Sequence, residues 1–266
     1  MKAVKVSKGD SAIILAQPHS GTHLPKTIAE NLNEVGRQLL DTDWHIPRLY
    51  DGLLPDATIV RANFSRYVID PNRDPNGGDL YPGQNSTALV PRSTFDGKAI
   101  WKIEPSGHEI EQRCKRYHFA YHQALSAEIE RLKSQHGTVL IYDCHSIRSK
   151  IPFLFDGRLA DLNIGDNSGQ SCAADITTAV ENACQNSKSH SVVSNGRFRG
   201  GWTTRYYGRP QDNQHAIQME LAQRAYLQTE SSPFAYDLNK AALLRSVLSD
   251  VLQELNRIII QRSLGG

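Results

Sequence analysis

The stretch 137-GTVLIYDCHSI-147 decides how the fold of this sequence is interpreted. Its apolar run, from Val139 to Tyr142, predicts a strand that is buried on both faces. The run stops in four polar or reactive side chains, which are Asp143, Cys144, His145 and Ser146. In an open α/β sheet, ligands and catalytic groups gather at the carboxyl end of a central strand. We therefore expect a functional site at this point.

Other apolar runs on both sides of this stretch extend the pattern. Residues 11–16, 57–62, 191–194 and 215–222 are expected to be strands, and residues 26–40, 107–135 and 173–184 are expected to be helices. Asp237 is expected to cap a final helix. Loops are predicted at 156–171 and 196–210. Strands that alternate with helices predict an α/β three-layer sandwich with a mostly parallel sheet.

Size and composition narrow the classes of function. The 266 residues fit a single domain spanning 1–266, and 39% hydrophobic with 22% charged residues is ordinary for a globular protein. The net charge of +2 is too small to indicate a nucleic acid or a membrane as partner. No apolar stretch reaches the length of a membrane span. The four cysteines form no CxxC pair, so we expect free thiols and a soluble cytoplasmic protein.

Two histidines that follow strands suggest a metal site. His19 and His145 each come at a strand end, so one edge of the sheet could hold both. Catalytic zinc typically has three protein ligands and a water, and Asp43 is the nearest candidate for a carboxylate ligand. The alternative is that each histidine is a hydrogen-bonded structural residue.

A second histidine pair, His118 and His122, lies four residues apart on the predicted long helix. That spacing places both imidazoles on one helix face, as in HExxH enzymes. Phe119 stands where those enzymes carry their carboxylate, and the pair flanks the buried stripe. We therefore interpret this pair as structural.

Glu220 is a carboxylate within an otherwise apolar strand, QMELA. Burying it is costly unless it is paired, hydrogen-bonded or bound to metal. It could form a salt bridge with an arginine, or it could act as a general base whose pKa burial has raised.

Asn72 and Arg73 form a second polar pair after a predicted strand. An arginine fork beside an amide is suited to gripping a substrate carboxylate. The alternative is that Arg73 pairs with the neighbouring Asp70 and Asp74.

Two loops could enclose a ligand. Residues 196–210 combine arginines with aromatic residues, which suggests either RNA contacts or an anion-binding wall of a small-molecule pocket, and we favour the wall. Residues 75–97 form either a lid or an ordered surface excursion. Cys144 is not expected to be a nucleophile, because it points to the face of the strand opposite His145.

Seven segments together carry a family resemblance: PHSGTHLP, DTDWH, FSRYVIDPNRDP, LYPGQN, YDCHS, GRFRGGWTTRYYGRP and HAIQMELAQRAY. In this order, from about Ala12 to Tyr226, they closely resemble the N-formylglutamate amidohydrolase family. The resemblance implies a branch of the zinc carboxypeptidase and aspartoacylase superfamily, with a central mixed sheet flanked by helices. It also implies zinc-dependent hydrolysis of N-formyl-L-glutamate to formate and L-glutamate, a step of histidine degradation.

The resemblance also implies roles for individual residues. His19 would be the first zinc ligand and His145 the last. The superfamily usually has His-x-x-Glu at the first position, but Thr22 stands here in place of the glutamate. Asp43 is therefore our choice for the second ligand, with His23 as the alternative.

The remaining roles concern the substrate, which is a small dianion. Asn72 and Arg73 would hold one carboxylate, and Arg197 or Arg205 the other. Glu220 would be the general base, and Arg66 would stabilise the oxyanion. Rival functions are a deacylase of another N-acyl amino acid such as N-formylaspartate, a zinc carboxypeptidase for peptides, and an RNA-binding module.

Overall fold

A single mixed sheet organises the molecule, for which a computed structural model describes residues 1–78 and 85–265. Its seven described strands lie in the order β1-β3-β2-β4-β7-β5-β6. Only the pairs β1–β3 and β5–β7 are antiparallel, so the expected mixed and mostly parallel sheet is confirmed. The strands are β1 (Val4–Ser7), β2 (Ile13–Gln17), β3 (Thr58–Ala62), β4 (Val139–Ile147), β5 (Leu162–Gly165), β6 (Val192–Ser194) and β7 (Gln214–Ala222).

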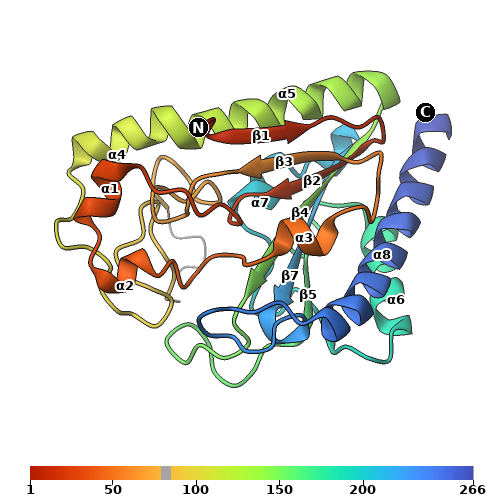
Figure 1. Cartoon of the computed structure of the whole chain (residues 1–266). Helices are drawn as coiled ribbons and strands as arrows, with labels where there is room; N and C mark the ends of the chain where they lie inside the picture. Colours follow the sequence, from red (N-terminus) through yellow and green to blue (C-terminus); the bar gives the residue numbers. More distant parts are fainter. Residues whose placement is uncertain (79–84, 266) are drawn as a thin grey trace.

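Helices cover both faces of this sheet, which gives the expected three-layer α/β arrangement. In Figure 1, α5 runs along the top, and α6 and α8 lie at the right-hand side. A π-helical turn, Cys114–His118, joins α4 to α5. The described helices are α1 (Lys26–Asn31), α2 (Glu34–Arg37), α3 (Ile46–Tyr50), α4 (Gly107–Arg113), α5 (Phe119–His136), α6 (Ala174–Asn186), α7 (Trp202–Tyr207) and α8 (Leu238–Gly265). Within the described ranges, no helix combines the length and apolar character needed to cross a bilayer.

The alternation of side chains along β4 decides which residues can reach a common site. Leu140, Tyr142 and Cys144 belong to the core cluster that includes residues of α6 and α8. Val139 and Ile141 belong to the opposite cluster, together with the buried stripe of α5. Because side chains alternate along a strand, Asp143 and His145 lie on the same face as Val139 and Ile141.

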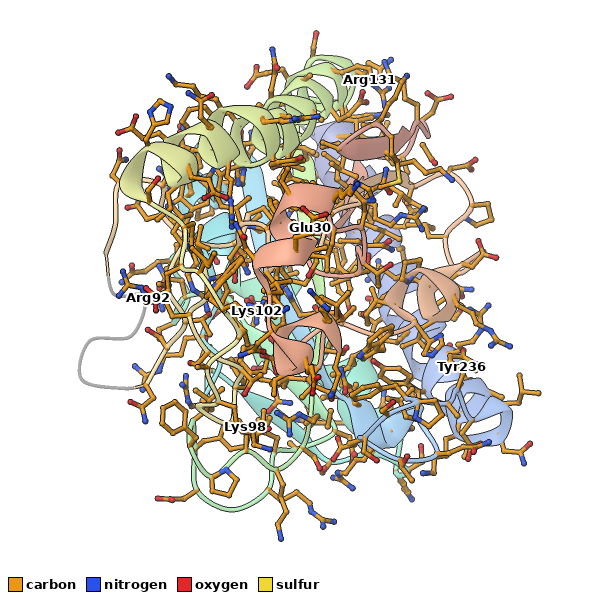
Figure 2. The ribbon with its side chains drawn as sticks, turned by 60° about the vertical axis from the view of Figure 1, so that its left-hand side comes forward. Glu30, Arg92, Lys98, Lys102, Arg131 and Tyr236 are labelled. Atoms are coloured by element: carbon orange, nitrogen blue, oxygen red, sulfur yellow. The ribbon has the colours of Figure 1, made fainter. Side chains whose placement is uncertain are left out.

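The long helix forms as the sequence predicts. Ser106 caps its start by accepting the N–H of Glu109, and Gly137, with φ of +70°, ends it. Arg131, labelled near the top of Figure 2, donates to Gly9 O at 2.8 Å and to Thr58 Oγ1 at 3.0 Å. These bonds attach α5 to the start of β3 and to the segment between β1 and β2.

Several predicted boundaries are wrong. The helix expected over 26–40 is broken into α1 and α2, because Leu32 turns out to bridge to Trp101 and Asn33 caps the N–H of Gly36. The strand expected to end at Tyr142 continues to Ile147, since β7 pairs with it along its whole length.

Short elements within predicted loops were also missed. The loop expected over 156–171 contains β5, and the loop expected over 196–210 contains α7. β1 is a further four-residue strand that the pattern did not reveal. By contrast, the cap at Asp237 is confirmed, because its Oδ1 accepts the N–H groups of Asn239 and Lys240.

Candidate active site

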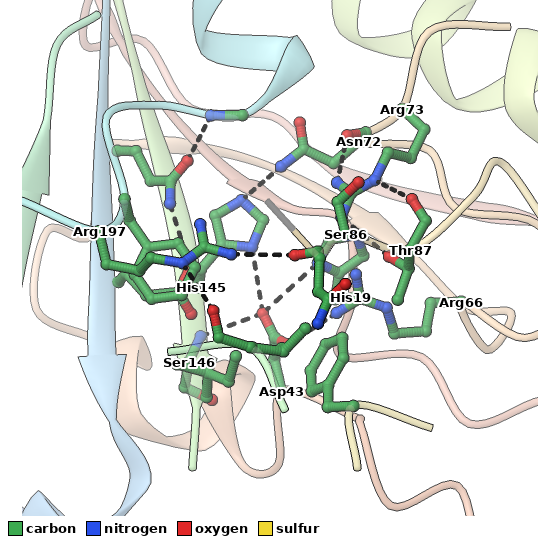
Figure 3. A pocket seen from close by; sticks show the side chains of 18 residues that line it. His19, Asp43, Arg66, Asn72, Arg73, Ser86, Thr87, His145, Ser146 and Arg197 are labelled. Atoms are coloured by element: carbon green, nitrogen blue, oxygen red, sulfur yellow. Dashed lines mark hydrogen bonds and ion pairs between the residues drawn. The ribbon is translucent and has the colours of Figure 1, made fainter. Parts of the chain in front are cut away.

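A pocket lies where β2, β4 and β7 bring polar residues to one face of the sheet (Figure 3). Most of the residues that the sequence suggested meet there. Those that line the pocket are His19, Asp43, Arg66, Asn72, Arg73, His145, Arg197 and Glu220. The described end of the loop predicted over 75–97 also contributes, through Ser86 and Thr87. Residues 79–84 of that loop lie outside the described residues.

Three side chains suited to a metal converge although they are distant in sequence. His19 follows β2, Asp43 precedes α3, and His145 lies in β4. Asp43 Oδ2 is 3.2 Å from His145 Nδ1 and 3.8 Å from His19 Nδ1. One ligand atom from each residue lies within 4.8 Å of the others. Tetrahedral zinc ligands are roughly 3.4 Å apart, so small movements would allow these three atoms to hold one ion.

A carboxylate lies behind each imidazole. His19 Nε2 is 2.7 Å from Asp70 Oδ1, and His145 Nε2 is 3.1 Å from Asp143 Oδ2. His19 Nε2 donates its proton to Asp70, which leaves His19 Nδ1 as an acceptor facing Asp43. His145 has a carboxylate at each nitrogen, Asp143 at Nε2 and Asp43 at Nδ1, and Asn72 Nδ2 also lies 3.1 Å from its Nε2. Metal-binding histidines almost always have such a partner on their second nitrogen.

The burial of these groups adds a further reason to expect a cation. His19, Asp43 and His145 are only 1–3% exposed, and Asp43 Oδ1 has no hydrogen-bond donor among the described residues. A buried carboxylate oxygen without a hydrogen bond is costly. Two imidazoles and a carboxylate are the donor set that zinc accepts, so these residues fit a divalent ion.

The two histidines differ in their protonation. Burial lowers the pKa of His19, and the positive charge of Arg66 lowers it further. Burial also opposes the charged form of His145, but Asp143 and Asp43 outweigh it and hold its pKa well above the ordinary value. A metal ion that binds His145 Nδ1 must therefore displace a proton.

Glu220 lies directly beside this cluster. It is the register partner of His145 in the parallel pair of β4 and β7. Gln218 Nε2 donates to Glu220 Oε2 at 3.0 Å, and the N–H of Gly201 donates to Gln218 Oε1 at 2.6 Å, which fixes the direction of the amide. Burial raises the pKa of Glu220 to about 8, although His145 opposes the rise. Such a carboxyl group can exchange protons near neutral pH.

Arg66 is held at the edge of the cluster by acidic groups. Its Nη2 donates to Asp70 Oδ2 at 2.6 Å, and its Nη1 is 3.9 Å from Asp43 Oδ1. The guanidinium lies over the ring of Phe95, 4.8 Å from the centroid. Asp70 thus joins Arg66 to His19, and these two groups with Arg73 hold the pKa of Asp70 well below its usual value despite burial.

Asn72 and Arg73 are fixed from several sides. Asn72 Oδ1 accepts the N–H of Thr203 at 2.8 Å, and the Asn72 N–H donates to Asp70 Oδ1 at 2.8 Å. Arg73 Nε and Nη2 donate to Thr87 O and Thr87 Oγ1, each at 2.9 Å. Arg73 Nη1 is 3.9 Å from Asp70 Oδ2. Arg73 is thus paired with Asp70 at a long distance, and Asn72 and Arg73 both line the pocket.

The two arginines suggested for a second carboxylate lie in different places. Arg197 lines the pocket, where its Nε donates to Leu154 O at 3.2 Å and its Nη2 to Asn85 O at 3.1 Å. Arg205 belongs to α7 and donates to Gly200 O at 3.0 Å, and it is not among the described residues that line the pocket.

Two other candidates also lie away from the cluster. His23 is exposed and forms a β-bridge with Phe64, outside the described pocket lining. Cys144 is buried on the opposite face of β4, and burial raises the pKa of its thiol well above the usual value. This placement agrees with the expectation that Cys144 is not a nucleophile.

The sequence did not reveal the residues that orient this site. Asp143 and Gln218 each stand two residues before a candidate, His145 and Glu220, so strand alternation could have placed them on the same face. Asp70 gave a weaker signal, because a carboxylate in a turn has many possible partners.

Comparisons with known proteins identify the family of this chain. The sequence model of the N-formylglutamate amidohydrolase family matches residues 11–227. The chain belongs to this family. It is 40% identical over 257 residues to the N-formylglutamate deformylases of Pseudomonas aeruginosa and Pseudomonas putida, covering 96% of this chain and 96% of each relative.

A solved structure shows the same fold. The N-formylglutamate amidohydrolase from Ralstonia eutropha JMP134 matches with a TM-score of 0.80 and 24% identity, over 98% of this chain and 99% of that one. The family that the sequence motifs suggested is therefore confirmed. This chain is a hydrolytic enzyme of the amidohydrolase type, acting on an amide.

Proposed function

We propose that this member of the family is a zinc-dependent enzyme that hydrolyses N-formyl-L-glutamate to formate and L-glutamate. The observation that carries the proposal is the convergence of His19, Asp43 and His145, with Glu220 in register beside His145. The names of the Pseudomonas relatives support the choice of substrate.

The metal would be held by His19 Nδ1, His145 Nδ1 and Asp43 Oδ2, the three atoms that face one another. Zinc bound there would polarise the formyl carbonyl and lower the pKa of a water molecule toward 7. Asp70 directs the Nδ1 lone pair of His19 toward this point, and Asp143 would do the same for His145 once a metal has displaced the proton from its Nδ1.

Glu220 is the proton carrier in this proposal. It accepts a proton from the attacking water and gives it to the departing amine, since its raised pKa suits both transfers. Gln218 holds the carboxylate in place. Arg66, which lines the pocket, supplies positive charge where the oxyanion develops.

The substrate is a small dianion, and its two carboxylates need separate positive groups. Asn72 and Arg73 would bind one of them, because a guanidinium beside an amide matches carboxylate geometry. Arg197 would bind the other, in preference to Arg205, because Arg197 lines the described pocket and Arg205 does not.

The same proposal includes the extent of the domain, the compartment, the pathway and the partners. We assign residues 1–266 to one amidohydrolase domain in the cytoplasm, working in histidine degradation, with neither nucleic acid nor membrane as partner. The four cysteines are free and buried, which agrees with a reducing compartment.

Formate release from N-formyl-L-glutamate tests the proposal directly. The protein should lose activity after treatment with a chelator and regain it with one equivalent of Zn²⁺ per chain. N-formyl-L-aspartate and a formylated dipeptide serve as competing substrates. A higher kcat/KM on either would refute the assignment of substrate, and full activity without metal would refute the assignment of zinc.

A further inference from the structure

The histidine pair on the long helix contacts the loop that carries Asn72 and Arg73. His122 Nε2 lies 2.7 Å from Pro71 O, and His118 Nε2 lies 2.9 Å from Arg73 O. The two carbonyls flank the residues that line the pocket. Because a carbonyl only accepts, each imidazole must carry its proton on Nε2 and donate it.

The other sides of the two imidazoles are enclosed by protein. His122 Nδ1 is 3.1 Å from the hydroxyl of Tyr207, and the ring of Trp202 lies 4.6 Å from that of His122 and 5.5 Å from that of His118. The two imidazole rings are 4.5 Å apart. Both histidines are buried, which lowers the pKa of each and brings that of His122 to about 3. They are therefore neutral donors in a fixed position.

The helix geometry explains why this face meets the loop. His118 is the last residue of the π-helical turn, and π turns occur frequently at functional sites. Residues four apart stand about 6 Å apart along a helix on one face, so His118 and His122 reach two carbonyls of the same turn. The N–H of Thr203 also holds Asn72, by donating to its side-chain oxygen.

We propose that His118 and His122 are positioning residues that set the direction of the Asn72 and Arg73 side chains toward a carboxylate of the substrate. They touch neither the reacting atoms nor the cluster of His19, Asp43 and His145. The proposal rests on the proposed function, because it assigns them to the substrate clamp of that same site. Their loss should weaken binding of the clamped carboxylate and leave the metal in place.

Substitutions with and without the donor test this role. His118→Leu and His122→Leu remove the Nε2 donor, and His118→Gln and His122→Gln keep an amide N–H near the same position. His136→Leu is the matched control: it lies on the same helix and removes the same kind of bond, from His136 Nε2 to Asp10 O at 2.7 Å.

Three substrates separate positioning from general damage. They are N-formyl-L-glutamate, N-formyl-4-aminobutyrate without the α-carboxylate, and N-formyl-L-2-aminobutyrate without the side-chain carboxylate. Each Leu variant should raise KM for N-formyl-L-glutamate about tenfold, the usual effect of one lost hydrogen bond, with kcat and zinc content near wild type. The effect should vanish on the analogue that lacks the clamped carboxylate, and the Gln variants should restore most of the KM.

The results that overturn the proposal are equally specific. They are an unchanged KM in both Leu variants, an equal rise on all three substrates, or an effect of the same size in His136→Leu. If wild type releases no formate, the proposed function fails. The positioning role is then tested by measuring the affinity for L-glutamate and the rates of amide hydrogen exchange over residues 68–76. Exchange there should quicken in the Leu variants alone, and unchanged exchange would overturn the positioning role.

Discussion

Replacing Asp70 by asparagine should uncouple His19 from the metal while preserving the shape of the site. Asp70 Oδ1 accepts from His19 Nε2 at 2.7 Å and from the N–H of Asn72 at 2.8 Å, and Oδ2 accepts from Arg66 at 2.6 Å. Every one of these partners is a donor. The amide NH₂ of an asparagine must therefore face a donor, whichever way it turns.

The imidazole of His19 can avoid the contact between two donors by changing its tautomer, but this change impairs metal binding. If His19 accepts at Nε2, its proton moves to Nδ1, the atom 3.8 Å from Asp43 Oδ2. A protonated nitrogen does not bind a metal. Loss of an outer-shell partner usually costs 10- to 100-fold in metal affinity, roughly 1.4 to 2.7 kcal/mol. We expect Asp70→Asn to lie at the upper end of that range.

A zinc titration against a chromophoric chelator measures this loss. Asp161→Asn is the matched control, because Asp161 is also buried, accepts the N–H of Ser191 at 3.0 Å and pairs with Arg224 at 2.8 Å, but does not line the pocket. The control should lose stability and keep its zinc affinity. Wild-type affinity in Asp70→Asn would refute the orientation that we assign to His19.

Further predictions concern the remaining groups of the pocket. Glu220→Gln should lower kcat by about 10²- to 10⁴-fold with zinc still bound, the usual range for a lost proton carrier; wild-type turnover would exclude Glu220 as the base. Burial raises the pKa of Glu220 from 4.5 to about 8, so its ionisation costs folding free energy as pH rises through that interval. Without metal, wild type should therefore lose thermal stability from pH 5 to 8, and Glu220→Gln should lose less in the same melting series. Arg73→Lys should raise KM for N-formyl-L-glutamate about tenfold, because lysine lacks the planar fork; equal KM values would count against the clamp. Arg197→Ala should raise KM more than Arg205→Ala, and the reverse order would reassign the second clamp.

The sequence predicted the strands of the sheet centre well, and it singled out residues that the fold brings together, for physical reasons. Long apolar runs such as that in β4 have few alternatives to burial, and His145 and Glu220 stand out because they interrupt such runs. Elements of three to six residues, such as β5 and α7, leave little periodicity to detect. Their formation depends on tertiary contacts, as when β5 pairs antiparallel with β7.

The network behind the candidate ligands was harder to predict than the ligands themselves. Whether Asp43 or His23 meets the two histidines depends on the path of the chain after β2, which local pattern does not encode. The roles of His118 and His122 were equally hidden. Their spacing indicated a shared helix face, but only the fold shows that this face meets the carbonyls around Asn72.

Because of the π-helical turn, the number of residues between Arg113 and His122 decides which carbonyl groups their side chains reach, as much as the identity of these residues does. Arg113 precedes it and donates to Val68 O at 3.1 Å, whereas His118 and His122 bind carbonyls slightly further along the same segment. One residue turns an α-helix by about 100°. A single deletion within Cys114–His118 would therefore rotate one anchoring group away from its carbonyl, while exchange of the exposed Lys115 would disturb neither. Tolerance of substitution at Lys115 combined with intolerance of its deletion would be the signature of these helix-to-loop contacts.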